Sequence, residues 1–256
     1  MTTDTLLADQ LRALKLPGFA RDFAAVAEKA EAQGWTMRQF LQHLAELELQ
    51  ARKTKRIQKN LHDSHLPREK TLAQLDVTRL SAPVRRQLPV LCQGGFAERA
   101  ENVLIFGLPG RGKTHVAIAI GLELIQQGVT VLFIEVFKLV QRLLVAKRDL
   151  KLERELQKLD AFDVLIIDDI GYIQQDRDET EVLFTLLAER YERKSVIITS
   201  NLVFSQWDRI FKDPMTTAAA IDRIIHHCVI LELNGPSFRA EAAQANLQQG
   251  TDTAEP

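Results

Sequence analysis

Residues 107–114 read Gly-Leu-Pro-Gly-Arg-Gly-Lys-Thr, which is a complete phosphate-binding loop. The glycines let the backbone turn its N–H groups inward around a phosphate. In this pattern the ammonium of Lys113 reaches the outer phosphates, and the hydroxyl of Thr114 binds Mg²⁺. We therefore predict that the loop binds ATP through Gly107, Leu108, Pro109, Gly110, Arg111, Gly112, Lys113 and Thr114.

The sequence around the loop supports this interpretation. The run Asn102-Val-Leu-Ile-Phe106 before it is short, apolar and typical of a strand. Residues 113–127 after it carry apolar side chains at helical spacing. A strand, a glycine-rich loop and a helix N-terminus are the three parts of an anion site, so we prefer a nucleoside triphosphate site to a structural glycine turn.

The composition fits a soluble globular protein of 256 residues, with 46% apolar and 26% charged residues. The first residues have neither a basic start nor an apolar signal core, and the longest apolar stretch is too short to span a bilayer. Cys92 and Cys228 lack any CxxC spacing or disulfide framework. We expect a reduced, cytoplasmic location with no membrane partner.

The first 70 residues carry only helical patterns, which predicts a small all-helical domain over residues 1–70. Helices are expected over residues 5–14 and 19–33, with a third starting at a capping box made by Thr36 and Gln39. Residues 71–243 are expected to form an α/β nucleotide-binding domain, and residues 244–256 a flexible tail.

Short apolar runs alternate with helical patterns after residue 102. The expected strands are Val103–Phe106, Val129–Glu135, Val164–Asp168, Val196–Thr199 and Cys228–Leu233. This alternation indicates βαβ units, so we predict a five-stranded parallel sheet flanked by helices.

Two strand ends carry the polar groups that a metal–nucleotide site requires. The run Val164–Asp168 is followed by Asp169, so two carboxylates stand at one strand end. We assign Asp168 to Mg²⁺, and Asp169 to a hydrolytic water that it orients or deprotonates. Asn201 follows the next strand and can place a water beside the γ-phosphate, although asparagine there is also ordinary turn chemistry.

His226, His227 and Cys228 look like a metal cluster in the sequence. Adjacent residues on a helix end or a strand point apart. We therefore expect an ordinary helix terminus at this place.

Taken together, these residues resemble the AAA+ ATPases, and within them the branch of DnaC-type helicase loaders and IstB-type transposition helper proteins. The resemblance covers nearly the whole chain and is closer to the IstB type. It rests on residues 14–18, 98–107, 113–115, 168–172, 197–201, 213–223, 226–227 and 235–239, with the loop at its centre.

The resemblance implies further roles. Asn201 would be the first sensor residue, and Arg239 a second nucleotide sensor. Arg223 would be an arginine finger that reaches the nucleotide of a neighbouring subunit, which requires a homo-oligomer in a ring or helix. Two positions depart from the family pattern, because Arg111 replaces a small residue and Asp169 stands where many AAA+ proteins have Glu.

Residues 52–70 hold seven basic side chains against two acidic ones. Charge runs are often merely solvated, but beside this resemblance we expect contacts with the phosphates of double-stranded DNA. The expected DNA-binding residues are Arg52, Lys53, Lys55, Arg56 and Lys59. No aromatic side chains alternate with them, so base stacking is not expected from this segment.

The sequence leaves three functions open. The first is an ATPase that assembles on DNA and recruits a transposase encoded by a neighbouring reading frame. The second is a DnaC-type replicative helicase loader, which would use the same residues for a different client. The third, more remote, is a small-molecule kinase built on the same loop.

Overall fold

The computed structural model describes residues 3–172, 177–209, 214–235 and 237. The chain divides into two compact units, Met1–Lys59 and Asn60–Pro256. The domain boundary predicted at residue 70 stays a prediction, and the predicted tail over 244–256 lies outside the described residues. No helix in the described ranges is both long enough and apolar enough to cross a membrane.

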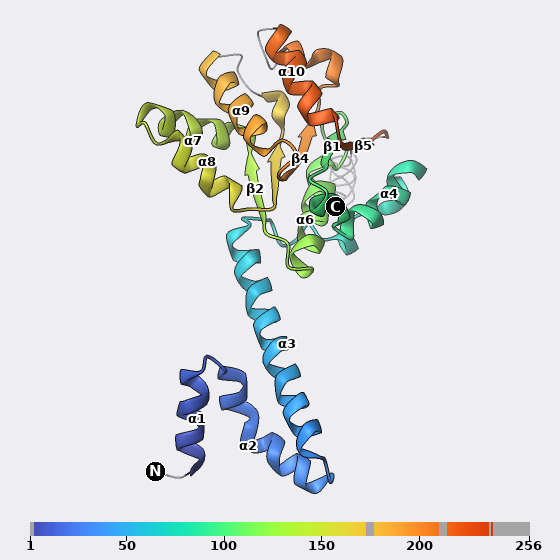
Figure 1. Ribbon diagram of the computed structural model, residues 1–256. Coiled ribbons are helices and arrows are strands. Elements are labelled where there is room, and N and C mark those ends of the chain that lie inside the picture. Colours follow the sequence, from blue (N-terminus) through green and yellow to red (C-terminus); the bar gives the residue numbers. More distant parts are fainter. Residues whose placement is uncertain (1–2, 173–176, 210–213, 236, 238–256) are drawn as a thin grey trace, which may run out of the picture. The chain divides into compact units, whose positions relative to one another are not determined.

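Three helices make up the N-terminal part of the chain (Figure 1). They are α1 (Thr3–Ala13), α2 (Pro17–Ala32) and α3 (Met37–Asp63). The predicted capping box is confirmed: the Thr36 amide donates to Gln39 Oε1 at 2.8 Å, and the Gln39 amide donates to Thr36 Oγ1 at 3.3 Å. These bonds satisfy two amides that the helix itself leaves without acceptors.

A buried carboxylate joins α2 and α3. Glu48 is 4% exposed and accepts hydrogen bonds from the Gly18 amide at 2.6 Å and the Phe19 amide at 3.3 Å. Arg52 donates to Glu48 Oε1 at 2.7 Å and also to the carbonyl oxygen of Lys15. Burial alone would raise the pKa of Glu48, but the hydrogen bonds from Arg52, Gly18 and Phe19 outweigh it and lower that pKa. Arg52 therefore has a structural role within the helical unit.

The second unit contains one parallel sheet with the strand order β2-β3-β4-β1-β5. The strands are β1 (Asn102–Phe106), β2 (Val131–Glu135), β3 (Val164–Asp168), β4 (Ser195–Ser200) and β5 (Cys228–Glu232). This sheet agrees with the predicted fold, and β3 has the predicted bounds. Every residue of β1, β3 and β4 is buried, as expected for strands covered on both faces.

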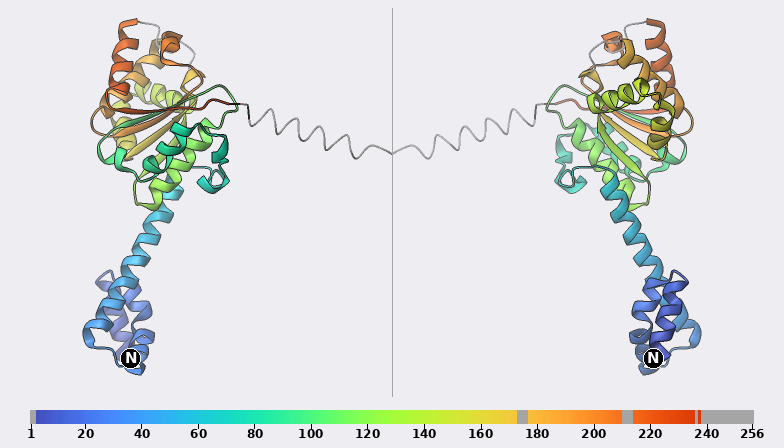
Figure 2. Two further views of the ribbon diagram at one scale, coloured as in Figure 1. Left: turned by 90° about the vertical axis from the view of Figure 1, so that its right-hand side faces the viewer. Right: turned by 90° about the vertical axis from the view of Figure 1, so that its left-hand side faces the viewer.

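Helices cover both faces of this sheet (Figure 2). The longer ones are α4 (Ala82–Cys92), α6 (Lys113–Gln126), α7 (Val136–Arg148), α8 (Leu152–Asp160), α9 (Arg177–Arg190) and α10 (Pro214–Ile225). Short turns of helix are α5 (Gly95–Glu98), η1 (Leu72–Gln74), η2 (Val77–Arg79), η3 (Ile170–Tyr172) and η4 (Phe204–Arg209). Helices α4 and α6 lie on one face, and α7 to α10 pack with the buried Trp207 on the other.

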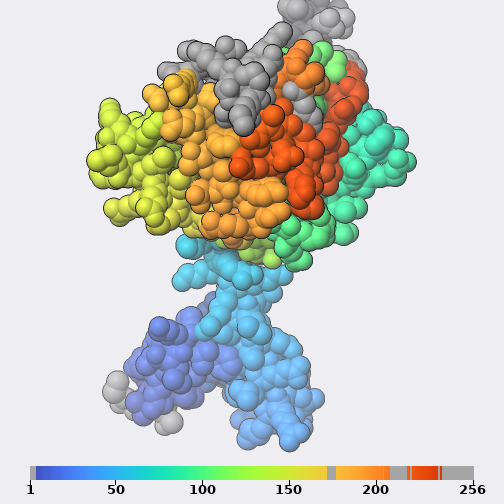
Figure 3. All heavy atoms as spheres, turned by 45° about the horizontal axis from the view of Figure 1, so that its top comes forward, coloured from blue at the N-terminus to red at the C-terminus, as the bar shows by residue number. Residues whose placement is uncertain are grey.

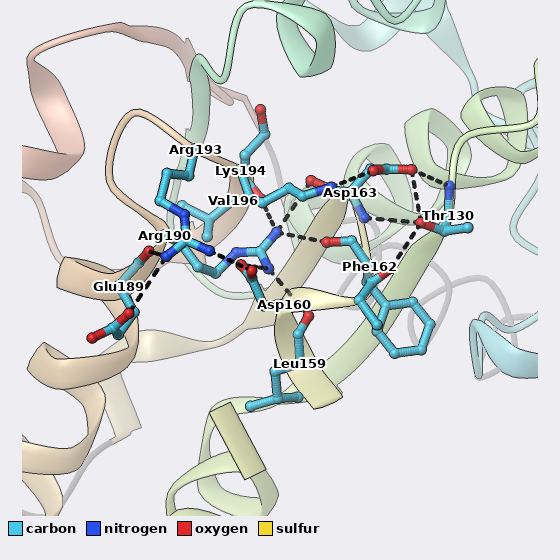
Figure 4. A network of polar contacts seen from close by, with 12 residues as sticks. Thr130, Leu159, Asp160, Phe162, Asp163, Glu189, Arg190, Arg193, Lys194 and Val196 are labelled. Atoms are coloured by element: carbon cyan, nitrogen blue, oxygen red, sulfur yellow. Dashed lines mark hydrogen bonds and ion pairs between the residues drawn. The ribbon is translucent and has the colours of Figure 1, made fainter. Parts of the chain in front are cut away.

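Arg190 at the end of α9 is buried at the edge of this core, with 2% of its surface exposed (Figure 4). Its guanidinium donates to four carbonyl oxygens at 3.0–3.1 Å, those of Leu159, Phe162, Asp163 and Ser195. Burial lowers the pKa of Arg190 to about 10, which still leaves the side chain cationic at neutral pH. One side chain thus joins the end of α8, the turn before β3 and the start of β4.

We expect Arg190→Met to destabilise the chain by about 3–5 kcal/mol, because it removes four hydrogen bonds from a buried guanidinium to carbonyl oxygens. Arg193→Met is the matched control. Arg193 is 58% exposed and pairs with Asp160 and Glu189, so we expect it to contribute less than about 1 kcal/mol. Urea unfolding of the two variants measures the difference. Equal losses would contradict the structural role of Arg190.

Candidate active site

The candidate site lies where three neighbouring strands end. β1 runs directly into the loop at Gly107, β3 ends at Asp168, and Asn201 follows β4. β4 lies between β1 and β3, so the carboxyl ends of all three strands meet at one edge of the sheet. Ligands in open parallel sheets bind at this edge.

The loop leads into α6 and borders a pocket of about 320 Å³. Gly112 precedes α6 with φ +84°, a backbone conformation that favours glycine. Lys113 is only 6% exposed, and its Nζ donates to the carbonyl oxygen of Leu108 at 3.2 Å. Arg111 donates to the carbonyl oxygen of Leu233 at 3.4 Å. Residues 109–114 line the pocket, together with Asp169 and Asn201 from the other strand ends.

Thr114, Asp168 and Thr199 form a hydrogen-bonded group beside the loop. Thr114 Oγ1 lies 3.0 and 3.1 Å from the two carboxylate oxygens of Asp168, and Thr199 Oγ1 lies 2.6 Å from Oδ1. Burial raises the pKa of Asp168. The Asp169 charge acts in the same direction, whereas the bonds from Thr199 and Thr114 and the Lys70 charge oppose it. A hydroxyl and a buried carboxylate are ligands that Mg²⁺ accepts, so this pair fits the predicted ion.

Asp169 and Asn201 face the pocket from two strand ends. Asp169 has a left-handed backbone with φ +58°, and its amide donates to Thr199 Oγ1 at 2.8 Å. Such strain in a residue other than glycine is concentrated at functional sites. Asn201 Oδ1 is buried, and no hydrogen-bond partner for it lies within the described residues. A buried acceptor of this kind suits the O–H group of a water molecule.

The pocket has a further wall that the sequence analysis missed. Lys70, Gln74, Leu75 and Asp76 line it from the segment that includes η1. His115 in the first turn of α6 holds this segment through a 2.9 Å contact between Nε2 and the carbonyl oxygen of Thr71. In the sequence Lys70 is only the last cation of the basic residues 52–70, whereas the structure places it in this pocket.

Thr199 and Gly171 were also missed. A side chain at Gly171 would bring its Cβ to 2.1 Å from Asn201 Oδ1, so glycine there makes room for the asparagine amide. The sequence offered a weak signal for both, because Gly171 follows the two carboxylates closely and Thr199 ends an apolar run. The contact of Thr199 with Asp168, and that of Gly171 with Asn201, depends on β3 and β4 being neighbours in the sheet.

Arg223 is not brought into this pocket. Arg223 lies on α10 with its guanidinium carbon 4.9 Å from the centre of the Phe184 ring, and it is not among the described residues that line the pocket. Its Nη1 is buried, and no hydrogen-bond acceptor for it lies within the part of the chain that is described. Arg239 lies outside the described residues.

The sequence matches the IstB-like ATP binding protein family over residues 9–246. The chain belongs to this family. A relative from Sinorhizobium fredii, an insertion sequence ATP-binding protein by name, is 42% identical over 97% of this chain and 84% of its own. The ATP-binding proteins of insertion sequences IS21 from Pseudomonas aeruginosa and IS5376 from Geobacillus stearothermophilus are 37% and 38% identical. They match 90% and 93% of this chain and 86% and 95% of their own lengths.

Solved structures with the same fold include replication proteins. A structure of DnaI covers 67% of this chain and 96% of its own with a TM-score of 0.56 at 22% identity. A structure of the replication initiator DnaA, bound to AMPPCP and single-stranded DNA, covers 73% of this chain and 56% of its own with a TM-score of 0.57 at 17% identity. These similarities show the fold. The predicted IstB-type resemblance and the AAA+ fold are confirmed.

Proposed function

We propose that this IstB-like protein is an ATP-hydrolysing enzyme that assembles as a homo-oligomer on double-stranded DNA and recruits and stimulates a transposase. The observation that carries the enzymatic part is that Thr114, Asp169 and Asn201 line one pocket beside the phosphate loop, with Asp168 hydrogen-bonded to Thr114. The relatives named for insertion sequences support transposition as the process that the enzyme serves.

In this proposal the loop amides and the Lys113 ammonium hold the phosphates of ATP. Thr114 and Asp168 hold Mg²⁺, which neutralises charge on the outer phosphates. Thr199 keeps the Asp168 carboxylate in place and, by accepting the Asp169 amide, fixes the backbone between the two acids. The acid that binds the ion and the acid that faces water are thus positioned by one buried hydroxyl.

Hydrolysis needs a water aimed at the γ-phosphate. Asp169 accepts a proton from this water, and the Asn201 amide orients it from the end of β4. The buried, unpartnered Oδ1 of Asn201 supports this role. Arg223 completes the site of a neighbouring subunit, where its charge stabilises the transferring phosphoryl group.

The DNA contacts are assigned to α3. Lys53, Lys55, Arg56 and Lys59 are exposed on this helix. Arg52 is set apart from them because it pairs with the buried Glu48, so a loss of DNA binding on its removal would have a structural explanation. The proposed interface therefore rests on the other four cations.

A helicase loader would use the same ATP site for a different client, and the fold similarity to a DnaC helicase loader keeps this alternative open. The insertion-sequence relatives favour transposition. A small-molecule kinase would transfer the phosphoryl group to a metabolite and would not respond to DNA.

The experiment that tests the proposal measures phosphate release from ATP with and without duplex DNA. We expect duplex DNA to raise turnover, and added transposase from the neighbouring reading frame to co-assemble with the ATP-bound protein on that DNA. If duplex DNA leaves turnover unchanged and a phosphate-accepting metabolite raises it, the proposal is overturned in favour of the kinase.

Neutralising Lys53, Lys55, Arg56 and Lys59 to Gln is expected to weaken duplex DNA binding equally for unrelated sequences. Each lost phosphate contact should also flatten the log–log salt dependence of binding by about 0.9. Fluorescence anisotropy at several salt concentrations measures both effects. The control is a variant with Lys138, Lys147, Lys151 and Lys158 changed to Gln, which removes the same charge from α7, α8 and the segment between them. An unchanged salt slope in the α3 variant would mean that these side chains are only solvated.

Lys70→Ala is expected to weaken MgATP binding about tenfold, because a pocket-lining cation whose charge acts on Asp168 is lost. Arg68→Ala is the matched control, since Arg68 is exposed, carries the same charge and is not among the described pocket residues. Calorimetric titration with ATP and with adenosine separates a phosphate contact from a general effect. An equal loss for adenosine would assign Lys70 to the pocket wall alone.

A further inference from the structure

Glu192, His226 and His227 form a cluster of possible metal ligands away from the nucleotide pocket. One ligand atom from each lies within 4.8 Å of the other two, and all three residues are exposed. The rings of His226 and His227 have their centres 4.2 Å apart, and His226 Nδ1 lies 3.7 Å from Glu192 Oε1. The expectation that the adjacent histidines point apart is therefore wrong. They follow the end of α10 in a turn, where neighbouring side chains can converge.

The surroundings hold this cluster in place. Tyr191 Oη lies 3.0 Å from His226 Nδ1, a contact that orients the ring and leaves Nε2 of His226 as the nitrogen for a metal ion. Glu192 has a left-handed backbone with φ +55°, so the turn after α9 directs this carboxylate at a conformational cost. The cluster thus combines two imidazoles and one carboxylate that approach from two separate turns.

We propose that Glu192, His226 and His227 bind a divalent transition-metal ion of the Zn²⁺ type. Imidazole nitrogen and carboxylate oxygen are the ligands that such ions accept, whereas Mg²⁺ and Ca²⁺ prefer oxygen alone. Ligand atoms around a tetrahedral ion with bonds of about 2.0–2.1 Å lie about 3.3 Å apart. The distances between the ligand atoms of these exposed side chains, now within 4.8 Å, need to shorten by at most about 1.5 Å to reach this spacing. The fourth position faces solvent and is open to water or to a group from a partner.

The ion would connect two helices that already pack against each other. Figure 3 shows the atoms of α9 and α10 in contact on one face of the molecule. Glu192 lies two residues after α9, and His226 directly follows α10. Arg223 lies one helical turn before His226, so a bound ion would restrict the helix that carries the proposed arginine finger.

Metal binding is tested on the full chain with any affinity tag removed, because a histidine tag would dominate the signal. Competition with a chromogenic chelator measures Zn²⁺ affinity and stoichiometry, with excess Mg²⁺ present to occupy oxygen sites such as Asp168. We expect one Zn²⁺ per chain, and at least tenfold weaker binding in each of His226→Ala, His227→Ala and Glu192→Gln. His62→Ala is the control, since His62 is an exposed histidine on α3 and should leave affinity unchanged.

A second measurement separates a lost ligand from a lost fold. Zn²⁺ should slow amide hydrogen exchange at the end of α10 and in the turn after α9 in the wild type and in His62→Ala, but not in the three ligand variants. Circular dichroism without metal confirms that the variants fold. Stoichiometric binding that survives all three substitutions, or no binding below about 100 μM, would overturn the proposal. Neither measurement depends on ATP hydrolysis or on DNA.

Discussion

Lys113→Ala is expected to abolish measurable ATP binding. Lys113 is 6% exposed at the first residue of α6 and lines the pocket, and in this type of loop its ammonium reaches the outer phosphates. Calorimetric titration with MgATP measures the effect, and Lys138→Ala is the control because Lys138 is 67% exposed and pairs with the exposed Glu135. If the Lys113 variant binds ATP as tightly as the wild type, the site has been assigned to the wrong residues.

Asp169→Asn completes this prediction by separating binding from chemistry. The substitution keeps the size of the side chain and leaves Thr114 and Asp168 in place, so MgATP should bind nearly normally. Turnover should fall by about 10²–10⁴-fold, because an amide cannot accept the proton of the attacking water. Single-turnover measurements with saturating ATP distinguish this loss from weaker binding. Binding and turnover that fall together would mean that Asp169 acts through the ion.

The parts of the site that the sequence predicts are those encoded locally. The loop at 107–114 is contiguous, and its strand and helix follow from apolar spacing. The two carboxylates at Asp168 and Asp169 stand at the end of a wholly buried run, which marks a strand end without any knowledge of the sheet. The strand pattern also gives the sheet type, because strands that alternate with helices pair in parallel.

The remaining parts depend on contacts between distant residues. Thr199 meets Asp168 only because β3 and β4 are neighbours, and strand order cannot be read from apolar periodicity. Lys70 reaches the pocket because His115 holds the segment beside it.

The charge pattern of the sequence also does not show which basic side chains have a structural role. Arg52 looks like one of several exposed cations, yet the buried Glu48 fixes it within the helical unit. Thr199 and the segment around Lys70 have roles set by partners far along the chain, whereas Arg52 pairs with Glu48 four residues away, and only the burial of Glu48 is hidden from the sequence.

Arg223→Ala is expected to leave ATP binding nearly normal while lowering turnover by about a thousandfold or more. Within one chain its guanidinium lies on the Phe184 ring and, among the described residues, takes no part in the pocket. A residue that completes a neighbour's site cannot act in a monomer. Activity should therefore rise steeply with protein concentration, or with DNA that gathers subunits. Arg223→Lys keeps the charge but not the planar fork, so we expect only partial activity.

Mixing the Arg223→Ala and Lys113→Ala proteins tests whether the arginine acts between subunits. At a mixed interface the first protein contributes an intact loop and the second an intact arginine, so some turnover should return although each protein alone is inactive. Recovery needs co-assembly, and it should appear only at protein or DNA concentrations that support an oligomer. If both variants unfold at the same midpoint as the wild type, the lower turnover is not caused by a loss of stability. If the mixture stays inactive while crosslinking shows both proteins in one assembly, Arg223 does not act in a neighbour's site.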